Sequence, residues 1–328
     1  MANLQYLTAQ AVSGIYARLK KGYVRPAYLD KVMVWLEGHD AKTPWVSGYA
    51  SAMEAYDPHT SGTEKPVAQY IELSVEEFKA SCEVPLKDMR RDLTNSLSRA
   101  AIIGDLAKRD MEHPETLFLD ALIAGAATEG YDGSYIFATD HTDDGGSYTA
   151  SQSNAIDSDI SDIPVANHGT TTNPSNQEFA ASIMAGVAQM QGFKDSMGNY
   201  VNRKVASIAV FCSSSMYMQA MSVNKSLDEY GGSNALEEVK KKTGLKIEVI
   251  SDSYLSAWTA KIVIVRTDVP RTFMLGIEED LPAEEALSVK SPANSDYCET
   301  YKCFTVKRFA NRKVKAGDWR NACQVTFT

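Results

Sequence analysis

The sequence has few histidines and none of the short motifs that mark large enzyme classes. Only 5 of its 328 residues are histidines, and the patterns HExxH, GxSxG, GxxxxGKS/T and GxGxxG do not occur. In many enzymes these patterns hold catalytic zinc ions, nucleophilic serines or phosphate groups. The chain therefore carries no standard catalytic signature, and we expect no enzyme activity, no metal and no cofactor.

Cysteine is scarce, and long apolar runs are missing. The 5 cysteines are never spaced as CxxC, so neither a disulfide framework nor a zinc site is indicated, and a reducing cytoplasm fits best. No run approaches the roughly 18 apolar residues of a membrane span. The first ten residues lack the basic and apolar segments of a signal peptide. We expect a protein that does not interact with membranes.

Positive charge is also in deficit. Lysine and arginine number 33 against 42 acidic residues, which gives a formal net charge of −9 and a pI of about 5.2. This balance argues against nucleic-acid binding driven by phosphate neutralisation. The content of 44% hydrophobic and 23% charged residues is typical of a folded globular protein. The length favours one large domain with excursions, or two coupled lobes.

Hydrophobic periodicity predicts a mixture of helices and strands, in the α+β class. The longest helix is expected over 93–127, interrupted or kinked at Pro114. A polar segment at 147–172 is expected to be a surface loop. The remaining predicted elements are a helix over the first twenty residues, strands at 31–36, 78–84, 207–212, 245–250 and 261–266, helices from 176, at 213–222 and at 234–242, and two antiparallel strands at 301–307 and 322–327.

Residues 45–84 resemble a long hairpin or extended loop that cannot build a core of its own. The segment is rich in turn formers and charges until 78–84, where apolar and polar residues alternate. A two-stranded ribbon is marginally stable in water, so its apolar side needs a surface to pack against. Its aromatic residues Trp45, Tyr49 and Tyr56 either cap the parent domain or anchor the segment in a partner.

The stretch YDGSYIFATDHTDDGG, at 131–146, gathers several carboxylates around one histidine. A calcium loop starting at Asp140 would need a Glu at its twelfth position, where Ser151 stands. Asp side chains readily accept hydrogen bonds from nearby amides, which favours a solvated or backbone-capping turn. The alternative is a metal-dependent hydrolase site, with the candidate residues Asp132, Asp140, His141 and Asp144.

One basic concentration lies near the C-terminus and invites three interpretations. It can be a solvated strand face, or a patch that meets carboxylates of a neighbouring subunit. Nucleic-acid binding ranks third, because the whole chain is acidic. The residues concerned are Lys307, Arg308, Arg312, Lys313, Lys315 and Arg320.

The order of elements and one long stretch of sequence resemble a known family. The stretch runs from FKASCEVPLKDMRRD (78–92) through PETLFLDALIAGAATEGYDGSYIFATDHT (114–142). In that family a strand leads into a proline-containing helix, which ends in a YDG turn followed by an aromatic residue and an acid before histidine. The matching residues here are Pro114, Tyr131, Asp132, Gly133, Phe137, Asp140 and His141. The chain thereby resembles the Hong Kong 97-like major capsid proteins of tailed phages, and is closest to the major head subunit of Mu-like phages.

The resemblance implies an α+β, Hong Kong 97-like capsid fold with five parts. These are an N-terminal arm and first strand (1–44), an extended loop (45–84), a peripheral domain with a long spine helix (85–175), an axial domain (176–286) and return strands of the peripheral domain (287–328). The 147–172 segment departs from the family pattern. The acidic stretch would then be the fixed turn that leaves the spine helix, with a structural role.

The function implied is that of a phage or prophage major capsid subunit. It would self-assemble into hexamers and pentamers of an icosahedral shell that encloses DNA, in the virion, after assembly in the host cytoplasm. Scaffolding, portal and protease proteins are the expected partners, and packaged DNA would be bound non-specifically. The residues expected at subunit interfaces are Trp45, Tyr49, Tyr56, Phe78, Lys307, Arg308 and Arg312. The alternatives are a bacterial encapsulin-like compartment shell and the hydrolase.

Overall fold

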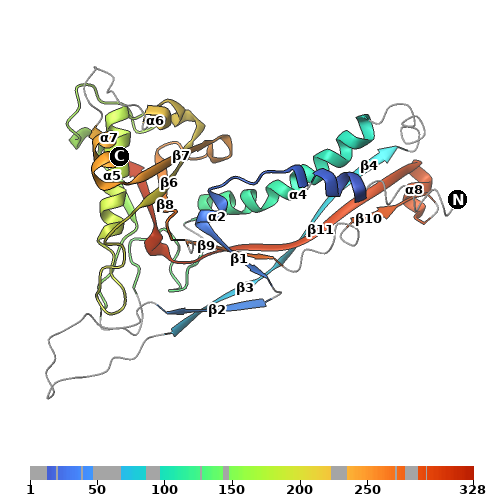
Figure 1. The fold of residues 1–328 in the computed structure, drawn as a ribbon, viewed down its shortest axis with the longest axis horizontal. Coiled ribbons are helices and arrows are strands. Elements are labelled where there is room, and N and C mark those ends of the chain that lie inside the picture. The colour runs from blue at the N-terminus through green and yellow to red at the C-terminus, as the bar shows by residue number, and fades with distance from the viewer. Residues whose placement is uncertain are drawn as a thin grey trace, which may run out of the picture.

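A computed structural model gives the fold of most of the chain. The residues it describes are 13–19, 21–37, 40–46, 68–85, 97–125, 128–142, 148–222, 235–269, 272–277, 287–292 and 294–328. Figure 1 shows two lobes, each built on its own sheet, in agreement with the predicted α+β class. None of the helices in this described part is both long and apolar enough to cross a membrane.

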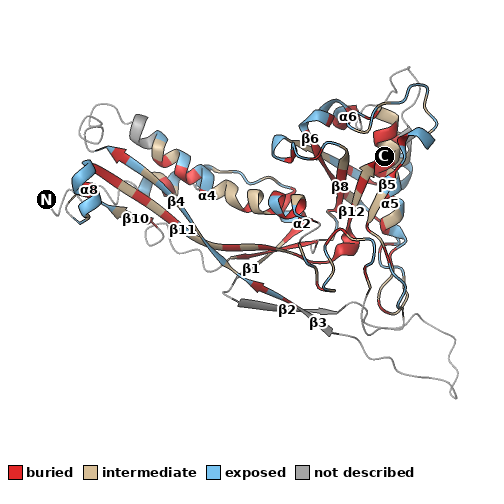
Figure 2. Ribbon diagram, turned by 180° about the vertical axis from the view of Figure 1, so that it is seen from behind, coloured by how far each residue is buried: buried red, intermediate tan, exposed pale blue. Residues whose placement is uncertain are grey.

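The first lobe is a five-stranded sheet with one long helix along it. The helix α4 (Leu97–Ile123) spans 27 residues, or about 40 Å. It lies along the strands of the sheet in both views (Figures 1 and 2). The strands are β1 (Met33–Glu37), β4 (Glu76–Pro85), β9 (Phe273–Ile277), β10 (Leu287–Lys290) and β11 (Cys303–Ala316). Two short helices accompany it, α2 (Leu29–Val32) and α8 (Asp296–Tyr301).

The second lobe is a five-stranded sheet in the order β5-β12-β8-β6-β7. Its strands are β5 (Ala155–Ser158), β6 (Ser207–Ser213), β7 (Lys246–Asp252), β8 (Lys261–Arg266) and β12 (Ala322–Phe327). Its helices are α5 (Asn176–Gln191), α6 (Tyr217–Ser222) and α7 (Ala235–Thr243). The side chain of Ser175 accepts from the backbone N–H of Glu178 and completes a capping box, which fixes the start of α5.

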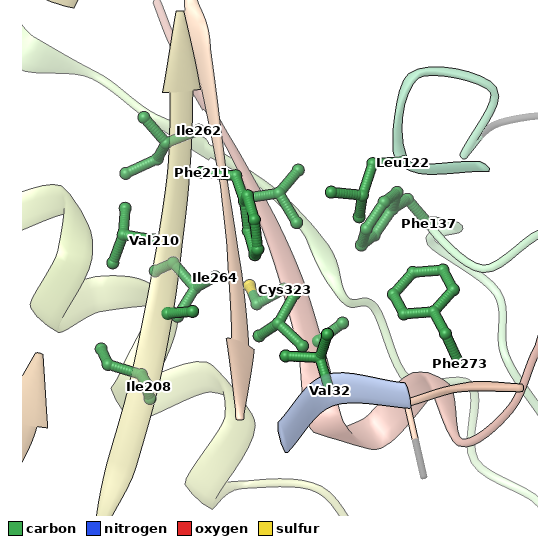
Figure 3. Packing of buried hydrophobic residues seen from close by; sticks show 14 of the residues in the cluster. Val32, Leu122, Phe137, Ile208, Val210, Phe211, Ile262, Ile264, Phe273 and Cys323 are labelled. Atoms are coloured by element: carbon green, nitrogen blue, oxygen red, sulfur yellow. The ribbon is translucent and has the colours of Figure 1, made fainter. Parts of the chain in front are cut away.

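A continuous hydrophobic core joins the two lobes. The ring of Phe118 on α4 packs edge-on against Phe273 of the first sheet, at a centroid distance of 5.0 Å, and against Phe211 of the second, at 5.4 Å. Figure 3 shows Val32 and Leu122 in the same cluster as Ile208 and Ile264. The lobes therefore share buried apolar surface, which favours a fixed arrangement over free hinge motion.

Several predicted elements have the expected positions, and their bounds differ where a local interaction decides them. The strand predicted over 31–36 begins at Met33, because Leu29–Val32 form the helical turn α2. In the N-terminal segment, 13–19 and 21–22 are helical. The long helix expected over 93–127 is observed as α4. Of the two alternatives given for Pro114, an interruption is wrong, since α4 continues through it.

The C-terminal hairpin prediction is also wrong. The strand β11 is 14 residues long and pairs with β4, β9 and β10, whereas β12 lies between β5 and β8 in the second sheet. A short 3-10 turn, Trp319–Asn321, separates the two strands, and the Asp318 carboxylate accepts the backbone N–H of Arg320 to begin it. This capped turn redirects the chain, so β12 enters the second core instead of folding back on β11.

The 147–172 segment is not simply a surface loop. Residues 155–158 form β5, which pairs in parallel with β12, and Ile160 is buried. Asn154 is fully buried, and its amide nitrogen donates to the carbonyl oxygens of Ile136 and Trp319. Polar composition misled the prediction because this amide is satisfied inside the protein.

The ribbon predicted at 45–84 is shorter than expected. Residues of β2 (Asp40–Val46) pair with β3 (Ala68–Ser74), as a hairpin requires, but β4 belongs to the first sheet. The base of the ribbon packs in the main core, where Ile71 and Leu73 are buried, so at this end the surface that the ribbon needs is supplied by its own chain and not by a neighbour. A Cβ added at Gly276 of β9 would lie 1.8 Å from Leu73 Cδ2, so the glycine makes room for this side chain.

Candidate functional site

A buried charge cluster fastens α4 to the first sheet. Arg308 Nε donates to Asp110 Oδ2 at 3.1 Å, and Arg312 Nη2 donates to Asp110 Oδ1 at 2.9 Å. All three side chains are at most 5% exposed. Arg308 and Arg312 share a face of β11 because they are four residues apart, which is an even spacing on a strand.

Pro114 explains why one of these arginines reaches the helix backbone. A proline has no N–H, so it leaves the carbonyl oxygen four residues earlier without its helical hydrogen bond. Here that carbonyl belongs to Asp110, and Arg312 Nη1 donates to it at 2.8 Å. The arginine thus satisfies the acceptor that the proline leaves open, and the helix can continue.

The N-terminal segment is tied to the same carboxylate. The hydroxyl of Tyr16, which is fully buried, donates to Asp110 Oδ2. Tyr16 also belongs to a small second core with Ile103, Leu106 and Val306. A side chain added at Gly104 would meet Leu19 only at ordinary contact distance, 3.6 Å. The segment is therefore held by the hydrogen bond from Tyr16 and by apolar contacts.

The electrostatics of the cluster keep Asp110 charged. Burial alone would raise its pKa, but Arg312, the hydrogen bond from Tyr16 and Arg308 together hold the pKa below the usual value. Burial and the neighbouring Asp110 raise the pKa of Tyr16. Burial and Arg312 lower the pKa of His113. The cluster is thus most stable with Asp110 ionised and His113 neutral.

A second buried polar cluster lies in the acidic stretch after α4. His141 Nδ1 lies 2.6 Å from Asp132 Oδ2, and both side chains are fully buried. His141 Nε2 lies 3.1 Å from Asn154 Oδ1, which acts as the acceptor because the amide nitrogen donates elsewhere. The other carboxylate oxygen of Asp132 accepts the backbone N–H of Ser134. The capping role predicted for this stretch is confirmed for Asp132, and the solvated reading is wrong for it.

These contacts remove the support for a hydrolase in this stretch. His141 is 0% exposed and lies beneath Trp319, so a substrate cannot reach its ring. Asp140 is exposed, and Asp144 lies outside the described residues. Within the described part of the chain, no three His, Cys, Asp or Glu side chains are grouped so that they could hold a metal ion.

The predicted interface residues fall into different environments. Phe78 on β4 is half-buried and packs edge-on against His113, at a centroid distance of 4.4 Å. Lys307 is partly exposed on β11, opposite Ser81 and Ser288. Arg308 and Arg312 are buried within the chain, so the solvated-face reading is wrong for both.

Of the three aromatic residues of the ribbon, one falls on a described element. Trp45 lies on β2, and Tyr49 and Tyr56 lie outside the described residues. Two further residues of the basic concentration, Lys313 and Arg320, also differ from each other in burial. Lys313 pairs with Glu76, whereas Arg320 is buried and bonds Asp318 through Nε at 2.8 Å.

Sequence reasoning missed the residues that organise both clusters. Asp110 sits among exposed charges on α4, and Asn154 sits in a polar segment, so neither stands out by composition. Pro114 was a signal for the first cluster, because a proline inside a helix leaves a carbonyl that needs another donor. Nothing in the sequence marks Trp319 as the partner of His141.

Comparison with known proteins identifies a family pattern in one part of the chain and a shared fold over nearly all of it. Residues 66–164 match the family described as the Mu-like prophage major head subunit gpT, and this range contains α4 and the turn that follows it. No curated protein compared with the chain matches it. The solved structures compared are below 15% identical in sequence, so their likeness concerns the fold.

Three solved structures have the same fold over nearly the whole chain. A virus-like particle from Pyrococcus furiosus is 8% identical, with a TM-score of 0.52, over 98% of this chain and 99% of that one. The mature capsid of bacteriophage PhiM1 is 11% identical, with a TM-score of 0.53, over 93% and 88%. The capsid of an empty GTA particle is 12% identical, with a TM-score of 0.50, over 93% and 98%.

The family match covers one side of each polar cluster. It begins before β4, includes Asp110 on α4 and the turn with Asp132 and His141, and ends after β5. Arg308, Arg312 and Trp319 lie outside it. The family matched by residues 66–164 is, by its description, one of structural head subunits. The resemblance drawn from the sequence is thereby confirmed over residues 66–164, which match the family of the Mu-like prophage major head subunit gpT, and nearly the whole chain shares its fold with solved capsid structures.

Proposed function

We propose that the subunit assembles into hexamers and pentamers of a closed icosahedral shell, with a Hong Kong 97-like organisation. The observation that carries the proposal is the clamp between α4 and β11, in which Asp110 joins Arg308 and Arg312. This clamp would hold α4 rigidly on the first sheet, so that the surfaces of the first lobe that contact different neighbours keep fixed positions relative to each other. A shell of identical subunits needs such stiffness, because each copy must present its contact surfaces at fixed angles.

The proposed parts follow the sequence boundaries, with changes where the sheets require them. The N-terminal arm ends before β2, and β9 is assigned to the peripheral lobe because it pairs with β1 and β11 in the first sheet. The extended loop is taken as β2, β3 and the residues between them, since β4 pairs with β11 in the peripheral sheet. The C-terminal strand β12 is assigned to the axial lobe, where it pairs with β8.

The driving force proposed for assembly is burial of apolar surface, at about 25 cal/mol per Å². Each contact is weak by itself, and repetition around a closed shell makes the contacts jointly strong. We assign Trp45, Tyr49, Tyr56, Phe78 and Lys307 to these contacts. Arg308 and Arg312 would act indirectly, by holding β11 in place.

The proposed partners follow from a shell that encloses DNA in a virion. Scaffolding, portal and protease proteins would assist its assembly in the host cytoplasm. Contacts with packaged DNA would be weak and independent of sequence, because the subunit has a net charge of −9. A compartment shell similar to encapsulins is the second candidate, supported by the fold shared with the virus-like particle from Pyrococcus furiosus.

Electron microscopy of the purified chain tests the proposal. The intact chain should form rings, tubes or shells. Deletion of 54–64, which lies outside the described residues, should leave a folded subunit that does not form shells. A variant in which 54–64 is replaced by a Gly/Ser segment of equal length should fail in the same way, because the side chains and not the loop length make the contact. Normal particles from both variants would contradict the loop assignment.

A nucleic-acid assay separates the two kinds of shell. Particles from cells that also express the partner proteins should retain nuclease-resistant DNA if the shell is a phage head. A shell that excludes DNA and instead retains a protein would favour the compartment. An intact chain that stays monomeric at all concentrations, with or without those partners, would overturn both.

A further inference from the structure

Two cysteines meet beneath the short helix α8, which Figure 1 shows at the end of the first lobe farthest from the second lobe. Cys298 and Cys303 are 0% and 1% exposed, and both thiols are free. Cys298 Sγ lies 3.6 Å from Thr305 Oγ1, and Cys303 shares that face of β11 because it is two residues from Thr305. A hydrogen bond also links the two thiols. The fold thus brings together a pair that the C-x4-C spacing does not announce.

The backbone between the two cysteines turns back at Lys302. This residue ends α8 in the left-handed conformation, with φ 51° and ψ 49°, and its N–H donates to the carbonyl oxygen of Cys298. In the described part of the chain it is the one non-glycine residue with a positive φ. Lysine rarely adopts this conformation. The turn returns the chain to α8, and two thiols already in contact need only a small movement to reach the S–S distance of about 2 Å.

The side chain of Glu83 connects the thiol pair to the surface. Glu83 is exposed on β4, and its carboxylate accepts the hydroxyl of Tyr297 at 3.0 Å. The thiol of Cys303 is hydrogen-bonded to the same side chain, and it is the donor because a carboxylate has no proton to give. The carboxylate is therefore placed to take the proton of Cys303 and pass it to water. One side chain separates the buried pair from solvent.

We propose that Cys298 and Cys303 are a modification site, at which hydrogen peroxide joins them in a disulfide bond. The sulfur of Cys303 attacks one peroxide oxygen, the O–O bond breaks, and a sulfenic acid and one water form. The sulfur of Cys298 then attacks the sulfenic sulfur, the S–S bond forms, and the second water leaves. The two thiols lose two electrons in total, and the peroxide gains them.

The reaction is slow in the folded protein. Burial and the hydrogen bonds to Glu83 and Cys298 raise the pKa of the Cys303 thiol to about 12, so little reactive thiolate is present near pH 7. A pair that reacts slowly stays reduced in a reducing cytoplasm. In a head that has left its host, the bond closes with time and holds α8 on β11. This use rests on the proposed function, whereas the bond itself does not.

Peptide mapping of the folded, unassembled subunit tests the inference. The subunit is treated with hydrogen peroxide, its remaining thiols are blocked, and it is digested with trypsin without reductant. Cleavage after Lys302 separates the two cysteines, so their peptides stay joined only through the disulfide. We expect this linked pair as the main disulfide product, and dithiothreitol should separate it. Its rate of formation should rise about tenfold for each pH unit between pH 7 and pH 9, as the thiolate fraction does.

Three serine variants show which thiols react. Cys298→Ser and Cys303→Ser should each abolish the linked pair. Cys82→Ser is the matched control, because Cys82 lies opposite Val306 and packs with it in the small second core, on the other face of the sheet. That variant should form the linked pair as the parent does. Oxidation should raise the melting temperature of the parent and of Cys82→Ser, and should not raise that of the other two.

The outcomes separate the inference from the proposed function. A folded parent that gives no linked pair at pH 9 overturns the inference, and so does a parent whose main disulfide includes Cys82 or joins two subunits. The peptide map of the parent decides this even if a serine variant fails to fold, which circular dichroism shows. Each of these results leaves the proposed shell function in place. A parent that forms the disulfide but never assembles would overturn the shell function and leave the modification site standing.

Discussion

The imidazole ring of His141 lies flat against the indole of Trp319, with ring centroids 4.1 Å apart and planes 6° from parallel. His141 belongs to the turn after α4, and Trp319 belongs to the link between β11 and β12. The stack therefore connects the end of the long helix to the point where the chain passes from one sheet to the other. Together with Asp132 and Asn154 it fixes the junction of the two lobes.

Removing His141 should destabilise this junction strongly. His141→Ala removes the histidine partner of the buried Asp132 carboxylate, and it removes the ring beneath Trp319. We expect a loss of about 3 kcal/mol in the free energy of unfolding. Asp140→Asn, at the exposed neighbouring residue, should change stability by no more than about 0.5 kcal/mol. Urea unfolding of the unassembled subunit measures both, and equal effects would contradict the structural role.

Replacing Asp110 should release α4 from the first sheet. Asp110→Ala leaves the buried guanidinium groups of Arg308 and Arg312 facing each other, which should cost about 3–5 kcal/mol. Asp105→Asn on the same helix is the matched control. Asp105 pairs with Arg109 at the exposed surface, so its replacement should cost less than about 1 kcal/mol. Thermal unfolding of both variants tests this prediction. Similar melting temperatures would contradict the role of Asp110 in holding α4 on the first sheet.

Acid should weaken the same cluster in two steps. The folded-state pKa of His113 lies below the usual value, so the unfolded chain takes up a proton first, and stability falls as pH drops below about 6.5. The pKa of Asp110 is also lowered, so its contribution is complete above about pH 5 and is lost as pH falls through the folded-state pKa. Melting temperatures between pH 7 and pH 3 test this. His113→Gln should flatten the first step and leave the second.

The base of the ribbon should be sensitive to one added methyl group. Gly276→Ala places a Cβ against Leu73, which must move, and we expect a loss of about 1–3 kcal/mol. Gly104→Ala is the control, because its Cβ meets Leu19 only at ordinary contact distance, 3.6 Å, and alanine favours the helix. That variant should be as stable as the parent or gain about 0.5–1 kcal/mol. Equal losses in denaturant unfolding would contradict the assigned packing.

The cysteines should differ in their reaction with a thiol reagent. Burial raises the pKa of the Cys212 thiol to about 11 and that of Cys323 to about 12. Cys82 is the one cysteine that is only half-buried. At pH 8 the folded, unassembled subunit should therefore be labelled slowly and at Cys82, as peptide mass spectrometry can show. Rapid labelling of Cys323 would contradict its position in the second sheet, and denaturation should expose all five.

Local pattern was enough to predict most elements. The alternation at 78–84 predicts β4, and the runs at 207–212 and 261–266 predict β6 and β8, because period and apolar content are local properties of strands. The helix predicted from 176 is likewise confirmed as α5, and the structure shows that a capping box of Ser175 and Glu178 fixes its start. The predicted turn after α4 is confirmed as well, but the depth at which Asp132 and His141 are buried was not predicted.

The sequence by itself determined the α+β class, the long helix and the resemblance to phage head subunits, since these depend on residue order and spacing. The tertiary structure decided which strands share a sheet, and so that β12 leaves β11 for the second lobe. It also decided that Arg308 and Arg312 turn inward to Asp110. A charge on a half-buried strand faces solvent or a carboxylate according to what packs on it, and that partner lies about two hundred residues away in the chain.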